Sequence, residues 1–461
     1  MNNRPRPFEF QKDVILDVED FDGRALCSLE MGLGKTLISL GILRRQRIES
    51  FPAVVVCPAS VKHFWEAEAI RMGIRPTVLE GQKVPKGRKL KPPRLTIINY
   101  DILRFWVPLL IKQGISTLIL DETQYIANRA TKRTRACTQL GRKAKHVLAL
   151  SGTPLVNRPA ELWPTLHIIR PDIYKSFWSY AQRYCRPRRT PWGWDYSGAS
   201  NTDDLHRKLT RTGMVRRLKR DVLRDLPDKM RSVVPVPITD MKEYVMARDN
   251  FISWLKQRRA DRVVTAQKAE QLTKIGYLLR LCAKLKLKSV VEWCNEFLDD
   301  SDEKLVIFAV HRKMIEALNR RVGGGKHVIV DGSVTGRMRK IAVDQFQRDP
   351  KTRVFIGNIK AAGVGITLTA ASNVAFAELY WRPGDFTQAE DRCHRIGAES
   401  TVWAHYLVAH GTIEERLAQI IQEKQQVIRD VLDGDRVVEE DDLNVWDQLV
   451  REMNSRQTTL L

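Results

Sequence analysis

The feature that most limits the fold of this chain is a repeated alternation of short apolar runs with helix-length segments. It occurs twice along the 461 residues. The first five runs cover 25–29, 53–57, 95–99, 117–121 and 146–150, and the second five cover 304–308, 326–330, 353–357, 373–378 and 402–408. Runs dense in Val, Ile and Leu between helices are typical of parallel strands covered on both faces. The pattern predicts an α/β chain with two open, mostly parallel sheets.

The spacing of the two sets of runs also suggests domain boundaries. We predict a first sheet domain over residues 1–170 and a second over 286–434. The segment between them, 171–285, is predicted to be a basic helical insertion, and 435–461 a helical tail. Because no low-complexity linker separates the domains, we expect them to share a cleft.

The composition indicates what the chain binds. It has 77 Lys and Arg but only 54 Asp and Glu, a net charge of +23. A chain this basic usually meets a polyanion, of which nucleic acid is the commonest, although a generally basic surface is the alternative. The seven cysteines form no CxxC pair and have no His at zinc spacing, and no apolar run is long enough to span a bilayer. We therefore expect an intracellular chain with reduced thiols and no zinc site.

A glycine-containing loop, EMGLGKT, follows the first apolar run and leads into a helical pattern. Gly32 and Gly34 allow a tight turn, so that backbone N–H groups around Leu33 point at an anion beside the positive end of the helix. A glycine-rich strand–helix turn without a ligand is the alternative.

Two residues after these glycines carry the chemistry of a phosphate loop. Lys35 is placed to reach the β- and γ-phosphates of a nucleotide, and the Thr36 hydroxyl to bind magnesium. The full pattern has a further glycine at the position of Leu29, so only half of it is present.

A pair of carboxylates follows a second apolar run, in TLILDETQ. At the end of a buried strand, Asp121 is placed to hold magnesium, and Glu122 to orient and deprotonate an attacking water. An acidic start to the next helix is the alternative.

Longer segments together resemble the motifs of one family. They are LSGTPLVN and ELW (150–163), VRRLKRDVLRDLPDK (215–229), residues 361–397 and TIEERL (412–417). Over nearly its whole length the chain is similar to superfamily-two helicase motors of the SWI/SNF type. GWDYSGASN (193–201) and FAELYWRPG (376–384) resemble the branch that includes annealing helicases. The resemblance implies two tandem RecA-like lobes, DNA-dependent ATPase activity, and ATP and magnesium as cofactors.

The resemblance also implies further residues of the nucleotide site. Arg392 and Arg395 match arginine fingers, which stabilise charge on the γ-phosphate. Gln388 and Gly365 are expected near the nucleotide, and Gln11 matches a glutamine that reads adenine. A solvated helix face for the arginines and an unremarkable polar residue at 11 are the alternatives.

The same resemblance implies contacts to nucleic acid. They involve Pro58, Ser60, Ser151, Gly152, Thr153 and Thr369. Ser60 is also expected to cap a helix that starts after the second apolar run. Residues 183–231 contain fourteen Lys or Arg and six Asp or Glu, with Trp192, Trp194 and Tyr196 among them. Such aromatics either stack on unpaired bases or pack a small helical insert.

One position departs from the family pattern. The family usually has His as the fourth residue of the DExx motif, where this chain has Gln124. The position commonly links the carboxylates to the Ser151 motif, and Gln can still donate and accept hydrogen bonds.

These observations lead to a functional hypothesis. We expect an ATP-hydrolysing motor that translocates on double-stranded DNA through its phosphate backbone, whatever the sequence. A strand-separating DNA or RNA helicase and a non-hydrolysing, ATP-controlled DNA clamp are the alternatives. The first motif begins near residue 8, so we expect a monomeric bare motor of phage or bacterial type, without a preceding substrate-recognition domain and recruited by a protein partner. It would act in the cytoplasm of a bacterial or phage-infected cell, or in the nucleus of a eukaryotic one.

Overall fold

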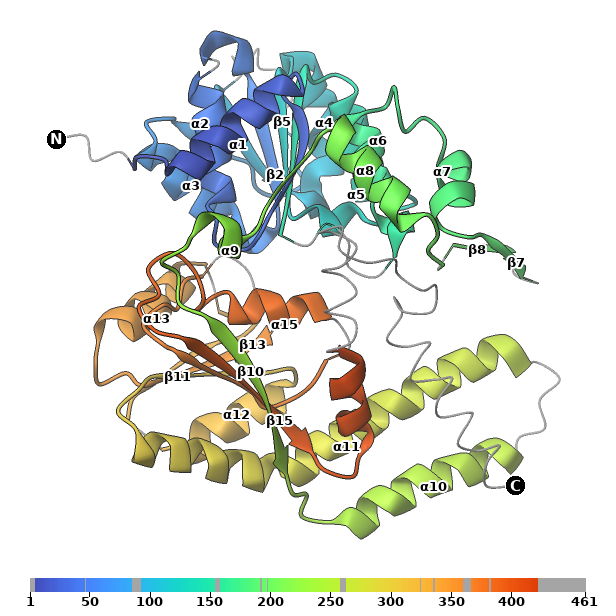
Figure 1. Ribbon diagram of the computed structural model, residues 1–461, viewed down its shortest axis with the longest axis vertical. Coiled ribbons are helices and arrows are strands. Elements are labelled where there is room, and N and C mark those ends of the chain that lie inside the picture. Colours follow the sequence, from blue (N-terminus) through green and yellow to red (C-terminus); the bar gives the residue numbers. More distant parts are fainter. Residues whose placement is uncertain are drawn as a thin grey trace. The chain divides into compact units, whose positions relative to one another are not determined.

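The computed structural model describes residues 5–45, 47–84, 93–152, 154, 158–190, 193–196, 198–257, 263–323, 325–334, 336–359, 366–380 and 383–421. They form two compact units, divided between Leu226 and Pro227. Each unit has a parallel sheet of its own with helices packed beside it (Figure 1).

The first unit is built on a seven-stranded sheet in the order β3-β4-β2-β5-β6-β1-β9. Its strands are β1 (Arg24–Leu29), β2 (Ala53–Cys57), β3 (Pro76–Val78), β4 (Leu95–Asn99), β5 (Thr117–Asp121), β6 (His146–Ser151) and β9 (Met214–Arg217). Its helices are α1 (Glu9–Asp20), α2 (Lys35–Arg45), α3 (Lys62–Arg71), α4 (Tyr100–Gln113), α5 (Lys132–Gly141), α6 (Trp163–Ile169), α7 (Phe177–Tyr184), α8 (Thr202–Thr212) and α9 (Lys219–Val222). A two-stranded hairpin, β7 (Arg188–Thr190) and β8 (Gly193–Asp195), stands apart from this sheet.

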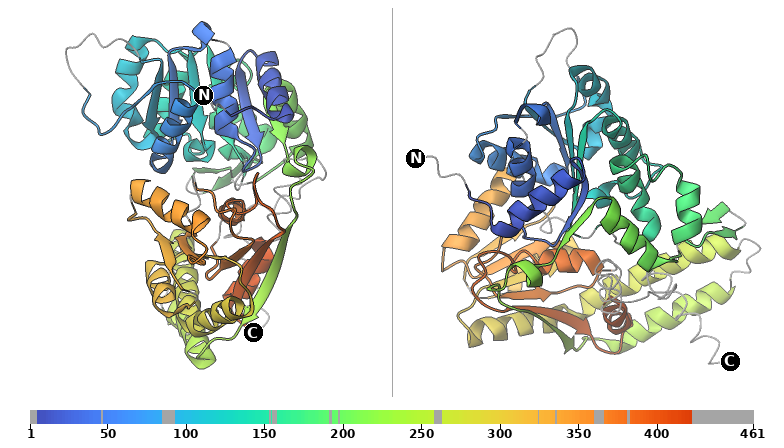
Figure 2. Two further views of the ribbon diagram at one scale, coloured as in Figure 1. Left: turned by 90° about the vertical axis from the view of Figure 1, so that its left-hand side faces the viewer. Right: turned by 45° about the horizontal axis from the view of Figure 1, so that its top comes forward.

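Helices cover both faces of the first sheet, as the two views in Figure 2 show. Helices α1, α2 and α3 contact one another in sequence on one face, and α4, α5 and α6 do so on the other. The central strands β2, β4, β5 and β6 are buried at every position. This two-sided burial explains why their sequences are continuous apolar runs rather than alternating patterns.

The second unit has a six-stranded parallel sheet in the order β10-β15-β14-β11-β13-β12. Its strands are β10 (Lys229–Val236), β11 (Leu305–Ala309), β12 (His327–Val330), β13 (Val354–Asn358), β14 (Asn373–Phe376) and β15 (Val402–Ala409). Its helices are α10 (Met241–Gln257), α11 (Val263–Asp300), α12 (Arg312–Arg321), α13 (Gly336–Arg348) and α15 (Pro383–Glu390), followed by a helical segment at 413–421. One core packs α11 and α12 on the sheet and a second packs α13, α15 and 413–421.

The predicted fold class is confirmed. All ten predicted strands are present, and each observed boundary lies within one or two residues of the prediction. Five strands were not predicted: β3, β7, β8, β9 and β10. The last four come from 171–285, expected to be a helical insertion: β7 and β8 form the hairpin, β9 pairs with β1 in the first sheet and β10 with β15 in the second. Strands β9 and β10 lie at sheet edges and are only partly buried: β9 has two buried and two half-buried positions, and β10 has half-buried and exposed positions with one buried residue at its end, so neither is a continuous apolar run. The predicted tail, 435–461, lies outside the described residues.

All seven cysteines are free and buried. Within the described part of the chain, no helix is long and apolar enough to cross a membrane.

Candidate functional site

The loop between β1 and α2 has the backbone that its sequence predicts. Gly32 and Gly34 take φ values of +89° and +80°, in the left-handed region that favours glycine. A Cβ built on Gly34 would lie 2.5 Å from the side-chain nitrogen of Gln11. That nitrogen donates to the Leu33 carbonyl at 3.0 Å, and the Gln11 Oε1 accepts from the Phe8 N–H at 3.0 Å. The structure therefore brings the buried Gln11 against the loop.

The lysine of the loop folds back onto the end of β1. Lys35 Nζ donates to the carbonyl of Leu29 at 2.9 Å, and the Leu29 side chain is fully buried in the sheet. The position where a glycine was expected is therefore the last residue of a buried strand, and only its carbonyl faces the loop. Thr36 lies half-buried in the first turn of α2.

The two predicted carboxylates lie at the end of β5 and are both buried. Asp121 accepts from the indole N–H of Trp65 at 2.7 Å, and its carbonyl accepts from the Tyr100 hydroxyl at 2.8 Å. Burial raises the pKa of Asp121, the charge of Glu122 adds to the rise, and the Trp65 hydrogen bond and the Lys35 ammonium oppose it. A cation bound beside this buried pair would therefore stabilise the ionised form of Asp121.

The sheet order explains how these segments meet. Strands β5, β6 and β1 are consecutive and parallel, so the carboxylates, Ser151-Gly152 and the loop all follow carboxyl ends at one edge of the sheet. A Cβ on Gly152 would lie 2.7 Å from the Met31 sulfur and 3.4 Å from Lys35 Nζ. The carboxyl edge of a parallel sheet is where ligands of this fold class bind.

A hydrogen-bonded chain connects two of these strand ends. Gln124 donates to the Glu122 carboxylate at 2.8 Å, and its carbonyl oxygen accepts from the Ser151 hydroxyl at 3.4 Å. The link expected of a family histidine is thus made by glutamine.

The donor set at this edge fits magnesium. Mg²⁺ takes hard oxygen ligands, keeps several waters, and needs only one or two protein oxygens beside phosphate. The Thr36 hydroxyl and the Asp121 carboxylate are such ligands. No group of three or more His, Cys, Asp or Glu in the described ranges could hold a metal, so the protein forms no complete cage there.

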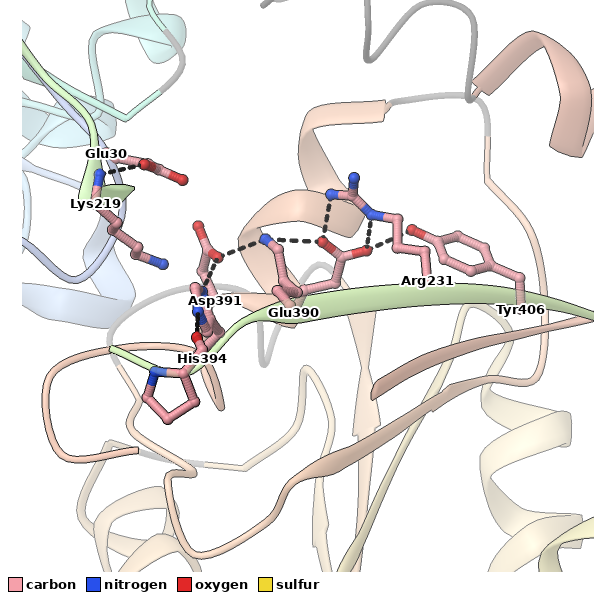
Figure 3. A network of polar contacts seen from close by, with 9 residues as sticks. Glu30, Lys219, Arg231, Glu390, Asp391, His394 and Tyr406 are labelled. Atoms are coloured by element: carbon pink, nitrogen blue, oxygen red, sulfur yellow. Dashed lines mark hydrogen bonds and ion pairs between the residues drawn. The ribbon is translucent and has the colours of Figure 1, made fainter. Parts of the chain in front are cut away.

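A backbone contact ties the loop to β9 and α9, which sequence reasoning did not connect with it. The Glu30 carboxylate accepts from the N–H of Lys219 at 2.7 Å, as Figure 3 shows. Arg216 donates to the Ser28 carbonyl at 3.3 Å. The end of the first unit is therefore fastened to the strand that carries the loop.

Of the predicted nucleic-acid residues in the first unit, Pro58 and Ser151 are buried and Gly152 contacts the loop. Ser60 is exposed, but it does not cap the helix as predicted. A 3-10 turn, Ala59–Val61, precedes α3, whose N-cap is Val61 and has no side-chain hydrogen bond. Thr153 lies outside the described residues.

The second unit carries the remaining predicted residues. Arg392 and Arg395 follow α15, and both donate to the Ile366 carbonyl, at 3.4 and 3.2 Å. Arg395 also donates to the Thr367 hydroxyl at 2.9 Å. Burial lowers the pKa of Arg395, while Asp391 opposes the shift. The structure thus gathers both guanidinium groups at one carbonyl.

The other predicted residues of this unit lie partly inside and partly outside the described ranges. Gln388 lies half-buried on α15. The Thr369 hydroxyl accepts from Gln347 at 3.1 Å. Gly365 lies outside the described residues.

A buried ionic network precedes the two arginines and was not predicted (Figure 3). Arg231 of β10 forms two parallel hydrogen bonds with Glu390, at 2.7 and 2.6 Å. Lys229 bonds Asp391 at 2.8 Å and Glu390 at 3.1 Å. The Tyr406 hydroxyl donates to Glu390 at 2.6 Å. Both carboxylates are fully buried, so the turn that carries the arginines is fixed to the first strand of the unit.

The electrostatics of this network favour the ionised forms. Burial opposes the ionisation of Glu390, but Lys229 and Arg231 outweigh it and lower the pKa of Glu390 to about 2. Burial likewise opposes the charge of Arg231, and Glu390 outweighs it, so the pKa of Arg231 is raised. No sequence signal pairs Lys229 and Arg231 with the two carboxylates, because these lie about 160 positions away along the chain.

Comparison with known proteins places the chain in a family. A family model described as SNF2-related domain matches residues 21–289, and one described as helicase conserved C-terminal domain matches 286–397. The human "DNA annealing helicase and endonuclease ZRANB3" is 35% identical over 97% of this chain and 42% of its own length. The Xenopus tropicalis "SWI/SNF-related matrix-associated actin-dependent regulator of chromatin subfamily A-like protein 1" is 36% identical over 91% of this chain and 44% of its own.

The chain spans less than half the length of these two relatives. Among solved structures, the "Sulfolobus solfataricus SWI2/SNF2 ATPase core in complex with dsDNA" aligns over 94% of each chain, with 23% identity and a TM-score of 0.45. The family matches together cover residues 21–397, from the end of α1 to the turn that carries Arg392 and Arg395. The chain therefore belongs to the SNF2-related family, whose SWI/SNF-type motor its motifs resemble.

Proposed function

We propose that this chain hydrolyses ATP with magnesium and uses the energy to translocate on double-stranded DNA. Such a motor would remodel DNA or protein–DNA complexes during repair, recombination or replication. We further propose that it works as a monomer on the phosphate backbone, recruited by a protein partner to DNA in the bacterial cytoplasm or the eukaryotic nucleus. The observation that carries the proposal is the convergence of Lys35, the Asp121-Glu122 pair and Ser151-Gly152 at the ends of three adjacent strands.

Each residue at this edge has a part in hydrolysis. The N–H groups of the loop and Lys35 hold the phosphates of the nucleotide. Glu122 orients a water and accepts its proton as the water oxygen attacks the γ-phosphorus and ADP leaves. Magnesium, held by Thr36 and Asp121, would neutralise charge on the β- and γ-phosphates.

Arg392 and Arg395 supply the remaining charge from the second unit. A guanidinium is permanently charged, so it stabilises the negative charge that builds on the transferring phosphoryl group. Because these arginines and the loop belong to different units, hydrolysis would depend on the two units closing together.

The proposal is tested by phosphate release with single-stranded, duplex, forked and RNA cofactors at two salt concentrations. We expect duplex DNA to stimulate release many-fold, and Lys35→Ala or Glu122→Gln to abolish the stimulated rate. Glu9→Gln, at a carboxylate 85% exposed, is the matched control and should behave like the parent chain. If RNA or single-stranded DNA stimulated phosphate release far more than duplex DNA, the proposal that the motor moves on duplex DNA would be refuted.

Two further assays separate the alternatives. ATP-dependent DNA binding without phosphate release would identify a clamp rather than a motor. A translocase displaces a triplex-forming strand but does not unwind a tailed duplex, whereas a strand-separating helicase unwinds it.

A further inference from the structure

The first unit carries a set of partly exposed aromatic rings that the proposed ATP site does not use. We call the four rings of Phe177, Trp178, Trp194 and Tyr196 the aromatic stripe. Trp178 and Trp194 pack edge to face at 4.8 Å between centroids, and Phe177 and Tyr196 do so at 4.9 Å. Trp178 also lies 6.4 Å from Tyr196, which joins the two pairs. The stripe therefore runs from the β7–β8 hairpin onto α7.

The two tryptophans of the stripe remain accessible. Trp194 is 48% exposed and Trp178 38% exposed. In an edge-to-face pair, the ring that presents its edge keeps both of its own faces uncovered by the other ring. Figure 1 shows the hairpin standing at the margin of the first unit, beside α7 and away from its sheet. The two tryptophans thus form the accessible surface of the stripe, while Phe177 and Tyr196 are half-buried and pack against the core of the first unit.

Arginines flank the stripe at both ends. The guanidinium of Arg129 lies 4.1 Å from the centre of the Phe177 ring. Arg189 is directly opposite Trp194 in the hairpin register, so both side chains lie on the same face. Arg188, also exposed, has Asp195 opposite it on the other face.

Two acidic residues in the segments around α7 are held in ion pairs of their own. Asp172 is bound by Arg170 at 2.7 Å, and Asp204 by Arg183 at 2.8 Å. With these carboxylates already paired, Arg129 and Arg189 leave the stripe with a positive margin. Flat rings edged by positive charge complement a ligand with flat rings and phosphates.

We propose that the aromatic stripe binds unpaired nucleotides. Bases stack on Trp194 and Trp178, while Arg189 and Arg129 contact the phosphates on either side. Bases of an intact duplex are already stacked on their neighbours and cannot offer their faces, so the ligand is a single-stranded segment. The site is additional to the proposed duplex track and does not depend on ATP hydrolysis.

The test is the affinity of the full chain for labelled oligothymidine, measured by fluorescence anisotropy. We expect Trp194→Ala to weaken binding roughly 5- to 50-fold, since a base–aromatic stack contributes about 1–3 kcal/mol. Trp194→Phe should retain most of the affinity, because it keeps an aromatic face. Arg189→Ala should weaken binding and reduce the salt slope by about one phosphate contact.

Trp403→Ala is the matched control, because Trp403 is 42% exposed and lies on β15 of the second unit. It should bind oligothymidine like the parent chain. The affinity of Trp194→Ala for blunt duplex, and its duplex-stimulated phosphate release, should also be unchanged.

Three results would overturn the proposal: parental oligothymidine affinity in Trp194→Ala, an equal loss in Trp403→Ala, or an equal loss of duplex affinity. An equal loss of duplex affinity would mean that the stripe is part of a general DNA-binding surface. Parental oligothymidine affinity in Trp194→Ala would mean that the stripe binds a protein partner instead. A chain that failed to hydrolyse ATP would refute the proposed function but leave the oligothymidine result intact.

Discussion

At the scale of single residues, Glu122 has the most unusual backbone of the proposed site. Its φ of +55° lies in the left-handed region, which a residue with a Cβ rarely adopts. Such a conformation costs about 1 kcal/mol or more and persists where the surroundings enforce it. Here it turns the chain sharply at the end of β5 and leaves the carboxylate bonded to Gln124. The strain is consistent with a catalytic carboxylate held in one orientation.

Gln124→Ala tests whether this orientation matters. The substitution removes both hydrogen bonds of the Glu122–Gln124–Ser151 chain, so we expect kcat for DNA-stimulated phosphate release to fall roughly 10-fold. KM for ATP should change little, because Gln124 does not hold the phosphates. Gln124→His restores a donor and an acceptor and should recover most of the rate. An unchanged ratio of DNA-stimulated to basal rate in Gln124→Ala would show that these hydrogen bonds do not couple DNA binding to hydrolysis.

Gln11→Ala tests the adenine contact. Its side chain is buried and already oriented by Phe8 and Leu33, so little ordering is needed on binding. We expect KM for ATP to rise about 10-fold, from the loss of one or two hydrogen bonds, with kcat nearly unchanged. The preference for ATP over GTP should fall by a similar factor. Equal losses with ATP and GTP would mean that Gln11 only supports the loop.

At the scale of elements, the buried network links β10 to the turn after α15. A buried ion pair that loses one partner leaves an uncompensated charge. We expect Glu390→Gln to lower the free energy of unfolding of the second unit by about 3 kcal/mol, measured by denaturant titration. Glu316→Gln is the control, because Glu316 forms an exposed i,i+4 pair with Arg312 at 2.9 Å, worth only about 0.3–0.5 kcal/mol.

The pH dependence of the free energy of unfolding, compared between the parent chain and Glu390→Gln, shows whether ionised Glu390 stabilises the folded state. The folded-state pKa of Glu390, about 2, lies below its ordinary value of 4.5, so ionised Glu390 stabilises the folded state at neutral pH. This contribution is lost as the pH falls from about 4.5 toward 2. The parent chain should therefore lose stability more steeply than Glu390→Gln in this window. Parallel curves would show that Glu390 ionises equally in the folded and unfolded states.

The elements also show what sequence can and cannot predict. Strands β2, β4 and β5 were predicted to the residue because both faces are buried, which makes their sequences continuously apolar. Strand β10 was not, because it lies at a sheet edge, is only partly buried and contains Pro235, a residue that edge strands tolerate. Lys229 and Asp391 meet only in the folded chain. Ser60 was wrongly assigned as a cap because a 3-10 turn, invisible to spacing arguments, precedes α3.

At the scale of the whole molecule, the proposed mechanism divides one reaction between two units. We expect Arg395→Ala to leave KM for ATP and affinity for duplex DNA near parental values while kcat falls about 1,000-fold. The reason is that a finger stabilises charge that develops only as the phosphoryl group transfers. Arg320→Ala, at an exposed arginine of the same unit, is the control. A loss of ATP affinity equal to the loss of kcat would instead make Arg395 a ground-state binding residue.

The buried cysteines have a practical consequence for measuring this division. Burial raises the pKa of all seven thiols, to about 12 for Cys27 and Cys294 among them, so they stay protonated and shielded from maleimide reagents. Cysteines introduced at exposed positions, such as Glu9→Cys in the first unit and Arg320→Cys in the second, would then be labelled selectively without deleting native ones. Energy transfer between two dyes at these sites would then report changes in the distance between the two units during ATP turnover.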